Sequence, residues 1–283
     1  GGWVIKYLFD FTVGKGHDAA LDGYFGEFIT GTAQPIIWFA IFVAITMAVV
    51  LLGVKNGIEK ASKVLMPVLI LLSLFIAIYV MFLPGAWDGV IYYIKPDFAN
   101  FSYKTIIAAM GQQFYSLSLA MGIMITYGSY VKKDVNLSKS VTRIEAFDTG
   151  VAFLIGMMII PAVYAFSGTD GMASGPSLMF VSLPKIFAEM GVIGNIVGIL
   201  FFILVTFAAL TSSVSILEAI VANVMELTGK SRKKITIITS VIIAIVAVAV
   251  CLGYNKFYFE VKLPGGGTGQ LLDVMDYISN SLL

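Results

Sequence analysis

The 283-residue chain is too apolar for an ordinary soluble domain, because 59% of its residues are hydrophobic and 12% are charged, against about 45–50% and about 25% in soluble proteins. Its mean hydropathy of +0.93 indicates a protein whose solvent is the lipid bilayer. A net charge of +1 without a basic face argues against nucleic acid as a partner, and the single cysteine, Cys251, excludes an internal disulfide.

The first residues, Gly1–Leu8, have the pattern of the last turns of a helix, and a polar segment follows from Asp10 to Thr32. This segment holds the only histidine, His17, which we expect to be solvated because no cysteine or second histidine can join it as a metal ligand. The chain does not start with methionine, and its last residues begin a new apolar run. We therefore expect a fragment cut inside a membrane domain at both ends.

Six apolar runs meet or approach the roughly 20 residues that a helix needs to cross a bilayer. These runs are Pro35–Val54, Val64–Leu83, Thr105–Tyr130, Phe147–Phe166, Val192–Met225 and Ile235–Leu252. The pattern predicts an all-α membrane protein, with residues 1–283 forming part of a single transmembrane domain. That domain would have about six complete membrane helices and a partial helix at each end.

Basic residues are concentrated in alternate connections between these runs. Lys55–Lys63 contains three lysines, and Lys132–Arg143 and Lys230–Lys234 contain four basic residues each. The positive-inside tendency places these connections on the cytoplasmic side. The opposite connections include two long ones, Pro84–Lys104 and Ser167–Gly191, which either cover an outer vestibule or only join helices.

The third run contains a polar stretch, Gly111–Gly122, with the sequence GQQFYSLSLAMG. Polar groups in lipid need partners. Glycines at both ends and serines two apart favour a helix that breaks at mid-depth and leaves carbonyl and hydroxyl groups free to bind a ligand. The alternative is a continuous helix whose serines bond to their own backbone. This stretch alone leaves both interpretations open.

Small and hydroxyl side chains share one face of the fifth run. Ala208, Thr211, Ser212 and Ser215 are spaced 0, 3, 4 and 7, which is the spacing of one helix face. Such a face either lets two membrane helices approach closely or presents oxygen atoms to a ligand.

Two acids lie in apolar runs, where ionisable residues are functional candidates. Asp148 is at the start of the fourth run, and Glu218 is inside the fifth. Asp148 is either a ligand or a residue that reaches the membrane interface. Glu218 is either a buried structural acid or part of a cytoplasmic network, and we favour the structural role.

Four motifs, in the right order, make the chain similar to the neurotransmitter:sodium symporter family, the sodium-coupled amino acid and amine transporters. The similarity runs from the end of the third family helix to the start of the tenth and covers essentially the whole chain. The motifs are Gly57-x9-Pro67 at the cytoplasmic start of the fifth family helix, GQQFYSLSLAMG followed by ITYGSY in the broken sixth, AALTSS at Ala208–Ser213 in the eighth, and Asp273-x-x-Asp276-Tyr277 in the tenth.

The resemblance implies the five-plus-five inverted-repeat fold, incomplete at both ends, and no covalent chemistry. It implies a symporter that carries a small amino acid or related amine with two sodium ions by alternating access. The expected location is the plasma membrane, as a multi-pass protein of a bacterial inner membrane. The alternative is a non-transporting sensor or structural subunit that retains the fold. Chloride dependence, oligomeric state and the identity of the substrate stay open.

The resemblance also implies roles for individual residues. The Ala208 carbonyl and the Thr211 and Ser212 hydroxyls match the second sodium site, and Ser116 matches the first. Asp148 matches an asparagine ligand of the first site, so this acid is either a ligand or a substitute for chloride. The remaining implied roles are a substrate pocket of Tyr115, Ser116, Ser118, Met121, Ser212 and Ile216, a gate of Gln112, Tyr115 and Asp276, and a hinge at Gly57 and Pro67.

Ala120 and Asp276 each carry a further expectation. Ala120 stands where relatives often have glycine, which affects the room beside the substrate. Asp276 is matched to an acid that forms an outer gate with an arginine of the first family helix. An ordinary acid in the first turn of a helix is the alternative, and that explanation suits Asp273 well.

Overall fold

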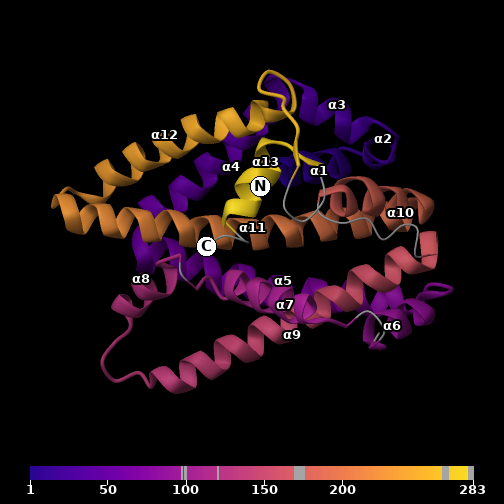
Figure 1. The fold of residues 1–283 in the computed structure, drawn as a ribbon, viewed down its shortest axis with the longest axis horizontal. Helices are drawn as coiled ribbons and strands as arrows, with labels where there is room; N and C mark the ends of the chain where they lie inside the picture. The colour runs from indigo at the N-terminus through magenta and orange to yellow at the C-terminus, as the bar shows by residue number, and fades with distance from the viewer. Residues whose placement is uncertain (97, 99–100, 120, 169–175, 263–267, 280–283) are drawn as a thin grey trace. The chain divides into compact units, whose positions relative to one another are not determined.

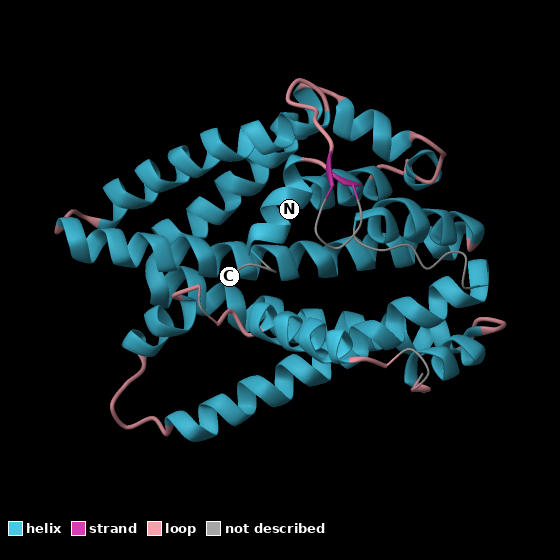
Figure 2. Cartoon of the chain, viewed as in Figure 1, coloured by secondary structure: helices cyan, strands magenta, loops and turns pink. Residues whose placement is uncertain are grey.

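The computed structural model describes residues 1–96, 98, 101–119, 121–168, 176–262 and 268–279, and this part of the chain is almost wholly helical (Figure 1, Figure 2). The helices are α1 (Gly2–Thr12), α2 (Gly16–Ala19), α3 (Tyr24–Thr30), α4 (Ala33–Leu51), η1 (Val54–Ile58), α5 (Glu59–Met81), α6 (Ala86–Ile94), α7 (Tyr103–Ser116), α8 (Ile123–Tyr130), α9 (Leu137–Ser167), η3 (Leu178–Ser182), α10 (Leu183–Glu189), α11 (Gly191–Thr228), α12 (Arg232–Cys251), η4 (Leu252–Tyr254) and α13 (Leu271–Tyr277). Two short strands, β1 (Val261–Lys262) and β2 (Thr268–Gly269), pair antiparallel. The prediction of an all-α protein is confirmed apart from this hairpin.

Five helices in the described part of the chain are long and apolar enough to cross a membrane. They span Ala33–Leu51, Val54–Met81, Leu137–Phe166, Gly191–Thr228 and Arg232–Tyr254. The remaining predicted run, Thr105–Tyr130, is divided between α7 and α8, and neither reaches about 20 residues by itself. The six apolar runs therefore correspond to five continuous helices and one interrupted helix.

The connection Lys55–Lys63, predicted as a loop, is helical, because η1 and the start of α5 run through it. Charged residues do not prevent a helix, and Glu59 in the first turn of α5 favours one through the helix dipole. The chain turns just before this point at Gly53, whose φ of 81° lies in the left-handed region that glycine adopts readily. Consequently α4 ends at Leu51 and not at Val54.

Two other predicted boundaries were also wrong. Helix α9 begins at Leu137, well before the predicted start at Phe147, so Asp148 lies inside the helix and not at its start. The polar segment Asp10–Thr32, predicted as a loop, contains the end of α1 and the two short helices α2 and α3. His17 is exposed on α2.

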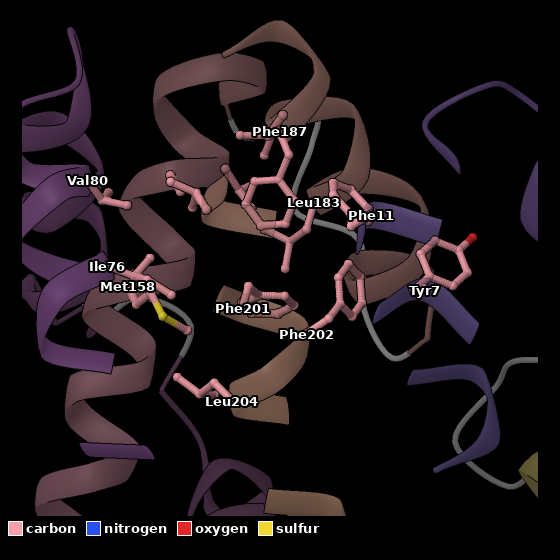
Figure 3. Packing of buried hydrophobic residues seen from close by; sticks show 14 of the residues in the cluster. Tyr7, Phe11, Ile76, Val80, Met158, Leu183, Phe187, Phe201, Phe202 and Leu204 are labelled. Atoms are coloured by element: carbon pink, nitrogen blue, oxygen red, sulfur yellow. The ribbon is translucent and has the colours of Figure 1, made fainter. Parts of the chain in front are cut away.

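A first compact unit, called unit 1, comprises Gly1–Glu27, Ser62–Asp97 and Ala146–Thr211. Its core is formed by buried aromatic and aliphatic side chains of α1, α5, α9, α10 and α11 (Figure 3). The Phe11 ring of α1 lies against the rings of Phe187 and Phe202, with centroids 5.9 and 5.3 Å away. Glycine makes room for it, since a Cβ atom at Gly198 would lie only 2.3 Å from Phe11.

A second compact unit, called unit 2, comprises Phe28–Ala61, Phe98–Glu145 and Ser212–Leu283. Helix α12 packs on α4. The buried apolar residues of this region are Val50, Ile58, Val214, Leu217, Val221 and Ile235. Helices α5, α9 and α11 contribute residues to both units.

Candidate functional site

The polar stretch Gly111–Gly122 interrupts a helix, as one of the two sequence interpretations predicted (Figure 1). Helix α7 ends at Ser116, and the amide of Ser118 donates to the Tyr115 carbonyl at 3.0 Å, which closes a tight turn. Ser118 has a φ of 54° and is the one non-glycine residue with a positive φ in the described part of the chain. Gly122, with a φ of 72°, then precedes the first residue of α8.

The left-handed backbone conformation of Ser118 costs conformational free energy, which points to a functional role. A non-glycine residue in the left-handed region is disfavoured by about 1 kcal/mol, and such strain persists mainly at functional sites. The interruption also creates a carbonyl end at α7 and an amide end at α8, which carry partial negative and positive charge. A cation and the two charged groups of a zwitterion fit these ends. Ala120 lies outside the described residues.

The side chains predicted to line a substrate pocket are accessible in unit 2. Tyr115, Met121 and Ile216 are 42%, 36% and 47% exposed. Helix α7 has no buried residue, and the first buried side chain after it among the described residues is that of Ile123 in α8. Gln112 and Ser116 are also exposed and Ser118 is half-buried, so the core of unit 2 does not cover the candidate binding residues.

The hydroxylated face of α11 divides into two parts with different partners. The Thr211 hydroxyl donates to the Ala208 carbonyl of the same helix at 2.9 Å, and its lone pairs are directed away from that bond. Ser215 instead lies 2.7 Å from the Tyr127 hydroxyl of α8. Ser215 thus joins two helices, whereas the Thr211 hydroxyl bonds within α11 and Ser212 is exposed.

A neighbouring serine also faces away from the candidate cation ligands. Ser213 Oγ lies 3.0 Å from the hydroxyl of Thr46, which is buried in α4 and also donates to its own Phe42 carbonyl. Together with Ser215, this contact connects α11 to two other helices of unit 2. Polar bonds of this kind hold membrane helices in register.

The other candidate residues, Asp148 and Asp276, lie on helices that were predicted from the sequence, although the start of the first helix was predicted wrongly. Asp148 is half-buried within α9. Asp276 is exposed on α13, and Asp273 caps that helix, because its carboxylate accepts a bond from the Gln270 amide at 2.8 Å. The simple helix-start explanation therefore holds for Asp273, and the gating role of Asp276 stays a prediction.

The predicted hinge residues, Gly57 and Pro67, lie in η1 and in the first half of α5. A Cβ atom at Gly57 would lie 2.0 Å from the Val49 carbonyl oxygen, so only glycine permits this approach. Pro67 lies inside α5 and removes one hydrogen bond of that helix.

Glu218 is completely buried and is held by Arg232 and Tyr130. Arg232 Nη1 donates to Oε2 at 2.6 Å and Nη2 donates to Oε1 at 2.7 Å, a bidentate pair, while the Tyr130 hydroxyl donates to Oε1 at 2.7 Å. Arg232 also donates to the Val50 carbonyl of α4 at 3.3 Å. This cluster joins α4, α8, α11 and α12, so the structural role favoured from the sequence and the network role both apply.

Sequence reasoning missed Arg232 and Tyr130 as members of this cluster. Arg232 was counted among loop residues, although it is half-buried and begins α12. The available signal was Glu218 itself, because a buried carboxylate requires a cationic partner and Arg232 lies only a short loop away in the chain.

The family model of the sodium:neurotransmitter symporter family matches residues 29–263 of this chain. The uncharacterized sodium-dependent transporter YhdH of Bacillus subtilis (strain 168) is 34% identical over all of this chain and 62% of that protein. An uncharacterized sodium-dependent transporter of Haemophilus influenzae is 33% identical with the same coverage. The human sodium- and chloride-dependent creatine transporter 1 is 25% identical over 62% of this chain and 29% of its own length.

Among solved structures, the crystal structure of MhsT in complex with L-phenylalanine is similar, with a TM-score of 0.87 and 38% identity over 99% of this chain and 63% of that chain. The chain therefore spans about three fifths of the length of MhsT and of its two bacterial relatives. These proteins are transporters and not enzymes, and the matched fold is the all-helical symporter fold in incomplete form. The chain belongs to the sodium:neurotransmitter symporter family, as part of a multi-pass membrane protein.

Proposed function

We propose that the full-length protein is a symporter that carries an amino acid across the membrane together with sodium by alternating access. The interruption between α7 and α8 carries this proposal, because it provides oppositely charged helix ends beside hydroxyl groups in a family of sodium-dependent transporters. The similarity to MhsT, solved with L-phenylalanine, supports an amino acid as the substrate class. We also propose that the protein lies in the plasma membrane, the inner membrane of a bacterium.

The second sodium ion is proposed to bind the Ala208 carbonyl and the Thr211 and Ser212 hydroxyls. A dehydrated sodium ion needs several oxygen atoms at short range, and one helix face offers three of them. The Thr211 hydroxyl now donates to the Ala208 carbonyl, whose other lone pair serves the helix. Binding of the ion therefore requires the Thr211 hydroxyl to rotate and release this bond.

The first sodium ion is proposed to bind Ser116 and the Asp148 carboxylate. A permanent negative charge at Asp148 would balance the ion, so this protein should transport without chloride. Replacing chloride by gluconate at constant sodium should leave the uptake rate unchanged. A requirement for chloride would show that Asp148 does not supply the balancing charge.

The substrate pocket is proposed to comprise Tyr115, Ser116, Ser118, Met121, Ser212 and Ile216, with Gln112, Tyr115 and Asp276 as gate residues and Gly57 and Pro67 as the hinge. Met121 should set the size of the pocket. Hydrophobic pockets discriminate by about 1–3 kcal/mol per methylene group. Met121→Ala should therefore shift the preference toward bulkier amino acids in competition binding, and an unchanged rank order of competitors would remove Met121 from the pocket.

The central test is uptake of radiolabelled amino acids by the full-length protein in proteoliposomes over a sodium titration. The double variant Thr211→Ala, Ser212→Ala should raise the half-saturating sodium concentration at least tenfold, about 1.4 kcal/mol. The matched control is Ser213→Ala, Ser215→Ala, which removes two hydroxyls of the same helix that bond to neighbouring helices. An equal half-saturation in parent and test variant would reject the site, and sodium-dependent binding without uptake would indicate a sensor.

A further inference from the structure

The segment Asp22–Phe25, called the strap, comprises the end of the turn after α2 and the first two residues of α3 in unit 1, and it contacts two other elements. Asp22 bonds to α10, Tyr24 bonds to α1, and the Phe25 ring packs on both η3 and α1. From the sequence, this segment was predicted only as part of a polar loop. Its contacts differ strongly in burial, which allows the contribution of each to be judged.

The inner end of the strap is anchored by a buried charged cluster on α1. Lys6 Nζ lies 2.5 Å from Asp10 Oδ1 and 2.7 Å from the Tyr24 hydroxyl, and also contacts Asp10 Oδ2. The Tyr24 hydroxyl donates to Asp10 Oδ2 at 2.7 Å. Lys6 and Asp10 are only 8% and 2% exposed. Tyr24 completes the bonding of two buried charges, so it cannot leave without exposing both to an apolar surrounding.

The tyrosine is suited to a permanent anchor. Burial raises the pKa of the Tyr24 phenol, and its hydrogen bond to Asp10 raises it further, so the hydroxyl keeps its proton. The Lys6 ammonium also lies 5.2 Å from the centroid of the Tyr24 ring, a distance that allows a cation–π interaction.

The outer end of the strap is joined to η3 and α10 by contacts of another kind. Lys185 Nζ of α10 lies 2.5 Å from Asp22 Oδ1, and the hydrogen bond from Lys185 lowers the pKa of the Asp22 carboxyl. Both side chains are exposed, at 43% and 91%, so salt screens this pair. The Phe25 ring stacks on Phe180 of η3, with centroids 5.2 Å apart and the planes 13° from parallel, and meets the edge of Trp3 of α1.

Helix α1 also contacts η3 and α10 directly. The Tyr7 hydroxyl donates to the Phe180 carbonyl at 2.9 Å. Phe11 and Phe187 meet edge to face in the core shown in Figure 3. The strap thus lies against two elements that already share one core.

We infer that the strap fastens η3 and α10 to α1, so that this outer connection and the membrane helix move as one body. The fastening runs from the buried Tyr24 anchor on α1 through the Phe25–Phe180 stack to η3, because the Asp22–Lys185 pair is exposed and screened. This inference concerns η3 and α10, which belong to the outer connection Ser167–Gly191 that the sequence left as either a cover or a simple link. It does not depend on sodium or on the substrate, and so goes beyond the proposed function.

The first test is hydrogen–deuterium exchange of the full-length protein in lipid nanodiscs. Tyr24→Phe keeps the ring and removes the anchor bonds, and should speed exchange of the α10 amides about tenfold. Asp22→Asn should speed it about twofold or less. The matched control is Glu189→Gln, which removes an exposed carboxylate of α10 and should change nothing. Equal exchange in Tyr24→Phe and parent would overturn the inference, as would a larger effect of Asp22→Asn.

The second test measures movement directly. Spin labels at Val13, after α1, and Glu189, at the end of α10, should keep one distance distribution in potassium chloride, in sodium chloride and in sodium chloride with L-phenylalanine. Tyr24→Phe should broaden that distribution. A distance that shifts between these conditions in the parent protein would show that the two elements move separately. This result is independent of uptake, so failure of the proposed symport leaves the inference standing.

Discussion

Units 1 and 2 each contain a buried cluster of one acid, one cation and one tyrosine, but the two clusters are built differently. In unit 1, Lys6 and Asp10 are four residues apart on one helix, and the tyrosine is the first residue of the short helix α3. In unit 2, Glu218 and Arg232 lie on two helices, and Tyr130 comes from a third. The first cluster therefore fixes the start of the short helix α3 to a charge pair within α1, whereas the second joins α8, α11 and α12 through a charge pair between helices.

The difference affects what happens when one partner is lost. Asp10 would keep the Tyr24 hydroxyl as a donor if Lys6 were removed, and α1 would keep its own backbone bonds. Glu218 would lose a bidentate partner on another helix and keep only Tyr130, which is 38% exposed. Loss of the cation should thus be more damaging in unit 2 than in unit 1.

The largest effect is expected for Arg232→Met, which leaves the fully buried Glu218 carboxylate without its cation. Breaking a buried pair from one side costs about 3–5 kcal/mol. The free energy of unfolding of the full-length protein, measured by titration of detergent micelles with dodecyl sulfate, should fall by that amount. The control is Lys233→Met, an exposed neighbour in the same helix turn, which should change it by less than about 0.5 kcal/mol. Similar losses in both variants would mean that Arg232 acts only as a surface charge.

The two clusters also show what the sequence could and could not reveal. Glu218 was identifiable because an acid inside a long apolar run is unusual. Lys6 and Asp10 were missed because they lie in a short, mixed segment at the start of the chain, where a charge pair looks like ordinary helix surface. Their partner Tyr24 comes from another helix, and the neighbouring Tyr7 packs on Phe180, which is far away in sequence, so no local pattern reports this packing.

The interrupted helix was the most predictable part of the candidate site. Its glycines and serines violate the apolar pattern locally, and the structure places the break where they occur. The bounds of helices were less predictable, because Lys55–Lys63 was taken as a loop from its charge alone. The sodium and substrate roles rest on similarity to the family, since a hydroxylated face such as that of Thr211 and Ser212 serves equally well for packing.

A second, smaller effect tests whether the Lys6–Asp10 ion pair stabilises unit 1 or only positions the strap. Lys6→Met should lower the free energy of unfolding by about 3 kcal/mol, because it leaves Asp10 buried with one donor. The double variant Lys6→Met, Asp10→Leu removes both charges and should recover most of this loss, to within about 1 kcal/mol of the parent. A double variant as unstable as the single one would show that the ion pair itself stabilises unit 1.

The smallest effect compares the two tyrosines, whose hydroxyls both bond to a buried carboxylate. Tyr24→Phe should cost about 1.5 kcal/mol, because the hydroxyl accepts from Lys6 and donates to Asp10, and both of these partners are buried. Tyr130→Phe should cost less than about 1 kcal/mol, since this residue is 38% exposed and water can bond to Glu218 in its place. The matched control, Tyr103→Phe, removes a hydroxyl from a side chain that is 69% exposed and should have no measurable effect. If Tyr130→Phe proved the more costly of the two, the cluster of unit 2 would depend on its tyrosine as well as on its arginine, and the proposed difference between the two clusters would be wrong.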